Sequence, residues 1–381
     1  MSFFTLIIFL LILSVIVVVH EFGHFIFARK FGVKVKEFGI GFPPRLIKLG
    51  RWWQTNFVLN LIPLGGYVNM AGENGVNEHE GHQSATKKNY QFYQKKPWQR
   101  FIIIFAGPGV NFILSAIIFM WVYSYLGIPQ KVENSVFIDG VEENSPAAEA
   151  KLSENTRIIA LINQAGEKLV ANNRDEVAAF IAQHQGQNLT IVTTGPCQAN
   201  QCELKEYPHL AYIRTNDEKP KNSGSLGIAL SEFQLFFYPW YQQIPLSVYH
   251  GSKQSIWMAQ EMLGGLAKGL TSLFKKEESD LVMMGPVGIV SELNKQKTFQ
   301  EGFLAIIQFA GLLSLNLGVI NLLPIPALDG GRLILIIIEK FIGRKKVSKV
   351  ESGLNYLGFM FIIALSILVT GQDIWRIFKG G

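Results

Sequence analysis

The chain has 381 residues, of which 49% are apolar and only 17% are charged, and its formal net charge is +6. This composition suits a membrane protein that carries a soluble domain of ordinary size. The basic residues flank apolar segments rather than form one soluble patch, which argues against a nucleic-acid-binding protein.

Four segments are long and apolar enough to cross a membrane, since a spanning helix needs about 20 apolar residues. They are residues 3–28, 101–126, 303–323 and 354–370. A fifth apolar run, 333–338, is too short to span and is expected to be interfacial or re-entrant. The first segment lacks the basic start and the cleavage site of a signal peptide, so we expect it to be retained.

The first apolar segment contains the motif His20-Glu21-Phe22-Gly23-His24. Ionisable groups are costly at membrane depth, where they mark functional sites. Residues four apart lie on one helix face, so His20 and His24 can bind one Zn2+ ion together. Glu21 lies about 100° around the helix, where it can take a proton from the zinc-bound water as general base. The alternative is a helix whose polar residues pair with neighbouring helices.

A second histidine-containing stretch, His79-Glu80-Gly81-His82, has the wrong spacing for this motif. Its surroundings are polar, and we expect it to be a solvated loop.

The positions of lysine and arginine predict the orientation of the chain. Basic residues are concentrated in 29–51, 87–100 and 332–349, which are therefore expected to be cytoplasmic. Both termini and residues 127–302 are then extracytoplasmic. Asp329, just beyond the third apolar segment, falls at a depth similar to that of the two histidines. Because a catalytic zinc ion has three protein ligands and a water, Asp329 is the best candidate for the third ligand. The alternative is a simple Asp-Gly turn.

Four regions follow from this pattern: 1–130, 131–232, 233–302 and 303–381. The first contains the first two spans and, at residues 33–70, a small antiparallel sheet at the cytoplasmic interface. A free edge of that sheet would either pair with an unwound substrate or serve only as a structural plug.

Residues 131–232 are expected to form an extracytoplasmic α+β domain of the PDZ-like kind. Such a domain either adds a peptide as an extra strand or sterically blocks intact ectodomains. Short helices are expected at 145–150 and 175–184, and strands at 157–162 and 189–193. Residues 233–302 are expected to be a helical and interfacial connector, in which 283–290 is a hairpin or loop.

Cys197 and Cys202 are the only cysteines. The predicted topology places both in an oxidising compartment, and we expect a disulfide between them. Two free thiols are the alternative.

Taken together, the motifs resemble the site-2 protease family of intramembrane zinc metalloproteases, in its bacterial RseP-type branch. The matching segments are 20–24, 62–68, 106–112 and 316–331, which follow the family's order along nearly the whole chain. Well-known members carry two PDZ domains where this chain has room for one. Arg332 stands where a histidine often follows the Gly-Gly pair, and no role is assigned to it.

The resemblance implies that His20, His24 and Asp329 bind zinc and that Glu21 is the general base. It also implies that Asn321 and Asn316 hold the substrate backbone, although an Asn in a membrane helix can simply bond to another helix.

The implied activity is hydrolysis of peptide bonds within or next to membrane spans of single-span proteins. The implied substrates are anti-sigma factors or remnant signal peptides, and the implied location is the bacterial inner membrane. Two other classes stay open: a catalytically silent membrane scaffold that recruits partners through its PDZ-like domain, and a metal transporter.

Overall fold

The computed structural model describes residues 3–73, 90–198, 201–203, 205–220, 223–275, 285–295, 298–300 and 302–378. The chain forms two compact units: Met1–Val122 with Gly251–Gly381, and Tyr123–His250. Residues 79–82 and part of the predicted hairpin at 283–290 lie outside the described residues. The predicted limits at 131, 233 and 303 remain predictions, since compactness divides the chain after residues 122 and 250.

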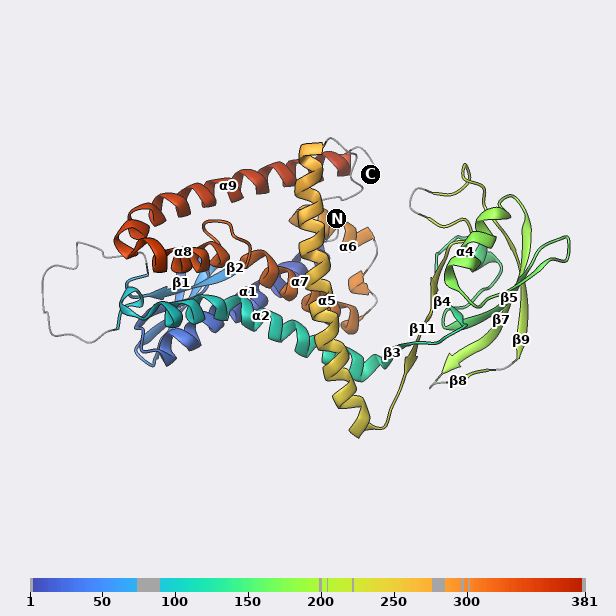
Figure 1. Ribbon diagram of the computed structural model, residues 1–381, viewed down its shortest axis with the longest axis horizontal. Coiled ribbons are helices and arrows are strands. Elements are labelled where there is room, and N and C mark those ends of the chain that lie inside the picture. Colours follow the sequence, from blue (N-terminus) through green and yellow to red (C-terminus); the bar gives the residue numbers. More distant parts are fainter. Residues whose placement is uncertain are drawn as a thin grey trace, which may run out of the picture. The chain divides into compact units, whose positions relative to one another are not determined.

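Four helices of the described chain are long and apolar enough to cross a membrane, which confirms the predicted number of spans. They are α1 (Phe3–Lys30), α2 (Pro97–Leu126), α7 (Phe303–Asn321) and α9 (Arg344–Phe378), and they are labelled in Figure 1. Helix α8 (Asp329–Ile342) contains the fifth apolar run. At about 1.5 Å per residue it is too short to span.

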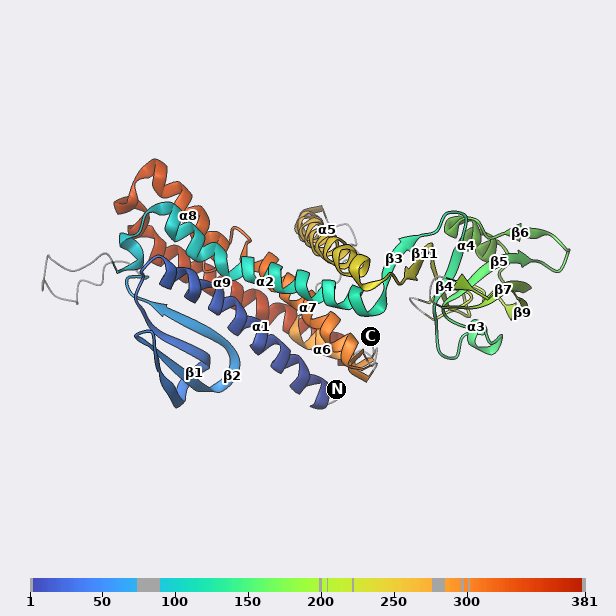
Figure 2. The same cartoon turned by 90° about the horizontal axis from the view of Figure 1, so that it is seen from below.

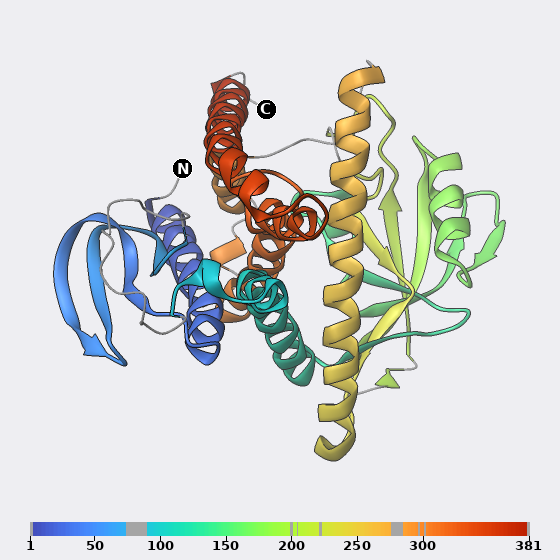
Figure 3. The ribbon, with the colours of Figure 1, turned by 60° about the vertical axis from the view of Figure 1, so that its left-hand side comes forward.

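Helices α1 and α2 approach each other closely, and Figure 3 shows them side by side in blue and teal. A Cβ atom added to Gly23 would lie 2.5 Å from the carbonyl oxygen of Ala106 on α2. The glycine inside the H-E-x-x-H motif therefore lets the backbone of α2 come within reach of the histidines.

Two long strands, β1 (Val35–Trp52) and β2 (Thr55–Met70), form an irregular antiparallel sheet beside α1, as Figure 2 shows. Residues 37–40 pair both with 56–59 and with 66–69, and Val35 pairs with Met70. The stretch 66–70 thus has one strand partner among the described residues and forms an edge of the sheet.

The edge stretch is held against α1 by an apolar cluster. Phe25 of α1, Phe38 of β1, and Val68 and Met70 of β2 are all buried in it. Burying these side chains fixes which face of the edge stretch points away from the helix.

The second unit is built on a seven-stranded sheet with the order β10-β4-β5-β7-β8, in which β6 also pairs with β5 and β9 with β7. A separate two-stranded ribbon joins β3 to β11. The strands are β3 (Ile128–Lys131), β4 (Val136–Val141), β5 (Thr156–Ile162), β6 (Lys168–Val170), β7 (Asn188–Gln198), β8 (Gln201–Cys202), β9 (Glu206–Tyr212), β10 (Ile228–Ser231) and β11 (Phe233–Phe236).

Two helices of the described chain lie wholly within this unit: α3 (Pro146–Glu149) and α4 (Arg174–Gln183). A third, α5 (Trp240–Lys275), begins in it and continues beyond its limit at His250. Helix α4 lies on the sheet in Figure 1 and buries Val177 and Ile181 in its core. The α4 N-cap is Asn173, whose side chain accepts a hydrogen bond from the Asp175 amide at 2.7 Å. The unit is α+β as expected, and its likeness to PDZ domains stays a prediction.

Cys197 and Cys202 are joined by a disulfide across the β7–β8 pair. Both belong to the second unit.

The expectation of a hairpin or loop at 283–290 is wrong for its described part from Pro286 onward. These residues begin helix α6 (Pro286–Lys295). The Asp373 carboxylate of α9 accepts hydrogen bonds from the amides of Gly285 (2.9 Å) and Gly288 (2.8 Å). A carboxylate at a helix N-terminus stabilises it, but this one comes from a distant part of the chain and leaves no local sequence signal.

Candidate metal centre

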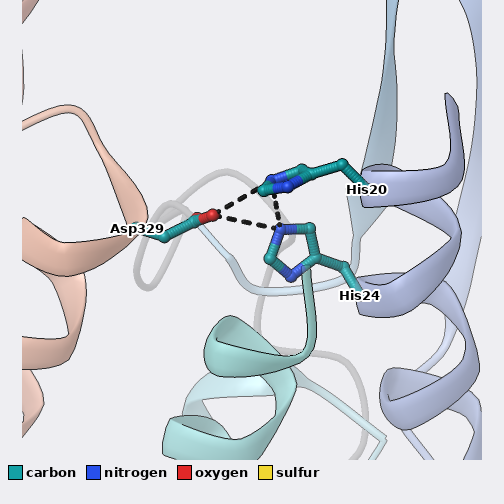
Figure 4. Close-up of side chains that lie close together, drawn as sticks. All are labelled: His20, His24 and Asp329. Carbon is teal, nitrogen blue, oxygen red and sulfur yellow. Dashed lines mark hydrogen bonds and ion pairs between the residues drawn. The ribbon is translucent and has the colours of Figure 1, made fainter. Parts of the chain in front are cut away.

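Three side chains from opposite ends of the chain converge in the first unit. His20 and His24 project from α1, and Asp329 points toward them from the first residue of α8, as Figure 4 shows. The two Nε2 atoms are 3.2 Å apart, and the Asp329 Oδ2 atom lies 3.1 Å from His20 Nε2 and 3.4 Å from His24 Nε2. Both histidines are buried.

This triangle has the dimensions of three ligand positions on a tetrahedral zinc ion. Ligand atoms bonded to zinc at about 2.0–2.1 Å lie about 3.3 Å from one another. The three observed separations are 3.1, 3.2 and 3.4 Å. Two imidazole nitrogens and one carboxylate oxygen also match the ligand types that zinc takes at catalytic sites. The residues present therefore fit the metal.

Helix α2 provides the space for the two imidazoles. A Cβ atom on Gly107 would overlap with His24 Nε2 and would lie 2.9 Å from His20 Cε1. Any larger residue at this position would displace the histidine rings.

Helix α2 also holds both rings from behind. The Nδ1–H group of His24 donates a hydrogen bond to the Ile103 carbonyl oxygen at 2.8 Å. A carbonyl can only accept, so His24 carries its proton on Nδ1 and keeps the Nε2 lone pair for a metal. His20 Nδ1 lies 3.2 Å from the side-chain nitrogen of Asn111.

Asp329 reaches the histidines through a tight turn between α7 and α8. A Cβ on Gly330 would overlap with the carbonyl of Leu322, and one on Gly331 with that of Ile325. Asn355 of α9 accepts a hydrogen bond from the Ala327 amide at 3.3 Å. The Gly-Gly pair is thus required for the close approach of the chain to itself, and the α8 N-terminus favours the negative charge of Asp329.

A cavity of about 290 Å³ opens beside the three side chains. Glu21 and Asn321 line it, together with Tyr67 and Val68 of the β2 edge stretch. Asn316 is not among the described residues that line the cavity. Five positions separate it from Asn321, which places the two side chains on different faces of α7.

Sequence reasoning assigned no role to Arg332, yet its side chain also lines this cavity. It donates a 2.5 Å hydrogen bond to the Glu73 carboxylate, which follows β2. Burial disfavours the charged guanidinium, but the Glu73 carboxylate outweighs this effect and raises the pKa of Arg332 above its ordinary value. The pair connects the end of β2 to α8 beside the candidate metal ligands.

Sequence reasoning also gave no part in the site to Gly107, Asn111 and Tyr67. The first two lie in the segment 106–112, which was noted only as a match to the family. Their spacing of four residues within an apolar helix was the signal that both face the same side.

The chain is similar to known proteins along nearly its whole length. The family model "Peptidase family M50" matches residues 8–365. Zinc metalloprotease RasP of Bacillus licheniformis is 27% identical over 98% of this chain and 99% of its own length. The protein named regulator of sigma-W protease RasP in Bacillus subtilis is 26% identical over the same shares. A Rickettsia conorii protein, provisionally named a zinc metalloprotease, is 30% identical over 97% of this chain and 98% of its own.

Proposed function

We propose a reaction for this chain from the premise that it belongs to peptidase family M50 and is a multi-pass membrane enzyme of the site-2 metalloprotease type. The proposed reaction is the hydrolysis of peptide bonds within or next to the membrane spans of single-span proteins. The observation that carries the proposal is the triangle of ligand atoms, with sides of 3.1–3.4 Å, that opens onto a cavity lined by Glu21.

His20, His24 and Asp329 would hold the metal. Zinc, when bound, supplies a Lewis acid that polarises the scissile carbonyl and lowers the pKa of water. The names of the relatives support zinc as the ion, as do the nitrogen and oxygen ligand types.

Glu21 is proposed as the general base. Its position next to His20 on α1 and in the wall of the same cavity supports this role. The carboxylate takes a proton from the attacking water and passes it to the amine of the leaving peptide. Asn321 is proposed to hold the substrate backbone by hydrogen bonds, and the absence of Asn316 from the described cavity wall makes Asn316 the weaker candidate for this role.

A substrate helix must unwind before its peptide bonds can be attacked, because its backbone groups are paired within the helix and lipid offers no replacement partners. The edge stretch 66–70 of β2 is proposed to supply those partners. Tyr67 and Val68 of this stretch line the cavity, and the stretch pairs with only one strand in the described sheet.

The second unit is proposed to lie outside the cytoplasm and to act either as a peptide-binding PDZ-like domain or as a steric filter. Strand β10 is the outermost strand of its sheet and pairs only with β4 in the described chain, which supports the addition of a peptide strand.

The proposed substrates are membrane-anchored anti-sigma factors or remnant signal peptides in a bacterial inner membrane. The name of the B. subtilis relative, a regulator of sigma-W protease, supports the first class.

The test compares wild type with Glu21→Gln in metal analysis and in a cleavage assay on single-span substrates. Glu21→Gln should retain one zinc ion per chain and lose cleavage by about 100-fold or more, because the proton acceptor is removed while the ligands remain. Asp329→Ala is the matched control, and it should lose both zinc and cleavage.

Two results would contradict the proposal. Near-wild-type turnover by Glu21→Gln would show that Glu21 is not the general base. Stoichiometric zinc without any cleavage by wild type would favour a catalytically silent scaffold instead.

A further inference from the structure

Asn111 is a fully buried polar residue on α2, in direct contact with His20. Its side-chain nitrogen lies 3.2 Å from His20 Nδ1, and its backbone carbonyl accepts a 3.0 Å hydrogen bond from the Ser314 hydroxyl of α7. Burying an amide without a hydrogen-bond partner is costly, and lipid offers no replacement partner at membrane depth. Its partner here is the far nitrogen of a candidate metal ligand.

The position of the ring proton on His20 determines whether Asn111 donates or accepts the hydrogen bond in this contact. For Nε2 to bind a metal it must keep its lone pair, so the ring proton must sit on Nδ1. A protonated Nδ1 needs an acceptor. Asn111 provides an acceptor if its side-chain amide is rotated by about 180°, so that Oδ1 rather than the nitrogen faces the ring. This rotation needs no extra space, because the two ends of an amide are nearly identical in shape.

Rotating the side-chain amide of Asn111 breaks no hydrogen bond that Oδ1 accepts. Asn111 Oδ1 has no hydrogen-bond partner among the described contacts. The side chain can therefore follow the tautomer of His20: it donates through nitrogen when Nδ1 is bare and accepts through Oδ1 when Nδ1 carries the proton.

We propose that Asn111 is a positioning residue that fixes the orientation and the tautomer of His20 for zinc, with Oδ1 accepting a hydrogen bond from Nδ1–H. The inference rests on the proposed function, in which His20 is a metal ligand. It also gives the segment 106–112 a role: Gly107 leaves room for the rings, and Asn111, one turn later, orients one of them.

The two histidines are held differently. His24 is oriented by the backbone carbonyl of Ile103, which no substitution removes, whereas His20 is oriented by a side chain. Substitution at Asn111 thus weakens one metal ligand selectively. The metal-bound tautomer of His20 needs a hydrogen-bond acceptor at position 111, and a group of the right size alone is not sufficient.

The experiment measures the zinc dissociation constant of the full-length protein in detergent by competition with a chromogenic chelator, and the visible spectrum of the cobalt-substituted protein. Asn111→Leu has similar volume but no hydrogen-bonding group, and zinc affinity should fall about 10–100-fold. Asn111→Asp keeps an acceptor, so its affinity should stay within about 3-fold of wild type or improve. Asn111→Ala, which cannot overpack the site, should show the same loss as the leucine variant.

Ser314→Ala is the matched control. It removes the bond to the Asn111 backbone while leaving the amide untouched, and zinc affinity should stay within about 3-fold of wild type. The cobalt spectrum should change in Asn111→Leu and remain wild-type in Ser314→Ala.

Wild-type zinc affinity in both Asn111→Leu and Asn111→Ala would overturn the inference, and so would an aspartate variant as weak as the leucine variant. His20→Ala separates this failure from failure of the proposed function. If His20→Ala loses zinc while Asn111→Leu does not, only the positioning role is lost. If His20→Ala binds zinc normally, the proposed ligand set is itself wrong.

Discussion

Gly107 controls the space that the metal centre occupies. The imidazole of His24 fills the position that a Cβ at residue 107 would take, and the ring of His20 lies next to it. Because both rings are buried, neither can move aside without disturbing the packing of α1 against α2.

Replacement of Gly107 by Ala should therefore weaken zinc binding by about 10-fold or more, since one added methyl group displaces a ligand. Gly109→Ala is the matched control. Its Cβ would lie 3.4 Å from Phe105 Cε1, an ordinary contact, and alanine in a helix is favoured over glycine by up to about 1 kcal/mol. Zinc content per chain, measured after gel filtration, checks both variants. Equal zinc content in the two would contradict the steric role of Gly107.

The ion pair between Arg332 and Glu73 is a second feature at the scale of single residues. Arg332 lies in the first turn of α8, where the helix dipole disfavours a cation, and the Glu73 carboxylate compensates for this.

Glu73→Gln should destabilise the protein by about 1–3 kcal/mol, because it leaves a largely buried guanidinium without its charged partner. The measurement is the free energy of unfolding in a detergent titration. Arg45→Gln, which breaks the pair with Glu37, is the control; the Arg45 side chain is more than half exposed, and a change within about 1 kcal/mol is expected. Similar losses of unfolding free energy in the two variants would mean that burial does not make the Arg332–Glu73 pair more stabilising than the exposed Arg45–Glu37 pair.

At the scale of elements, the centre is assembled by four helices and one strand, each with a distinct contribution. Helix α1 carries two ligands and Glu21, α8 carries Asp329, α2 supports the rings, α7 brings Asn321, and β2 forms a wall of the cavity.

The sequence predicted the type of most of these elements. The spans were expected from apolar runs and the sheet at 33–70 from its strand-forming residues, and short helices were expected at 145–150 and 175–184. The start of α6 was not, because the carboxylate that stabilises its N-terminus belongs to Asp373 on α9. A hairpin or loop was expected at 283–290 instead.

At the scale of the whole molecule, the placement of basic residues predicts that the second unit is extracytoplasmic. Ala165, exposed in the turn between β5 and β6, and Lys346, exposed on α9, sample the two predicted sides. In a Cys197→Ser, Cys202→Ser background, Ala165→Cys should react with a membrane-impermeant maleimide on intact cells. Lys346→Cys should react only after permeabilisation.

The reverse labelling pattern would mean that the chain is inserted with the opposite orientation. Labelling of both positions on intact cells would show that the membrane seal, rather than the orientation, had been measured.

The sequence by itself determined what depends on local spacing. His20 and His24 face the same side because they are four residues apart on a helix, and the spans follow from uninterrupted apolar length. The family, too, could be read from motifs in order along the chain, and the match to residues 8–365 confirms it.

The sequence already made Asp329 the best candidate for the third ligand, but only the tertiary structure shows that it meets the histidines and which other distant groups support them. Asp329 meets the histidines through a turn that requires Gly330 and Gly331, and Asn111 meets His20 because Gly23 lets α1 and α2 approach closely. Hydrogen bonds and steric exclusion act over a few ångströms in space without regard to separation along the chain. A spacing rule cannot register contacts between residues that lie 91 positions apart, as His20 and Asn111 do.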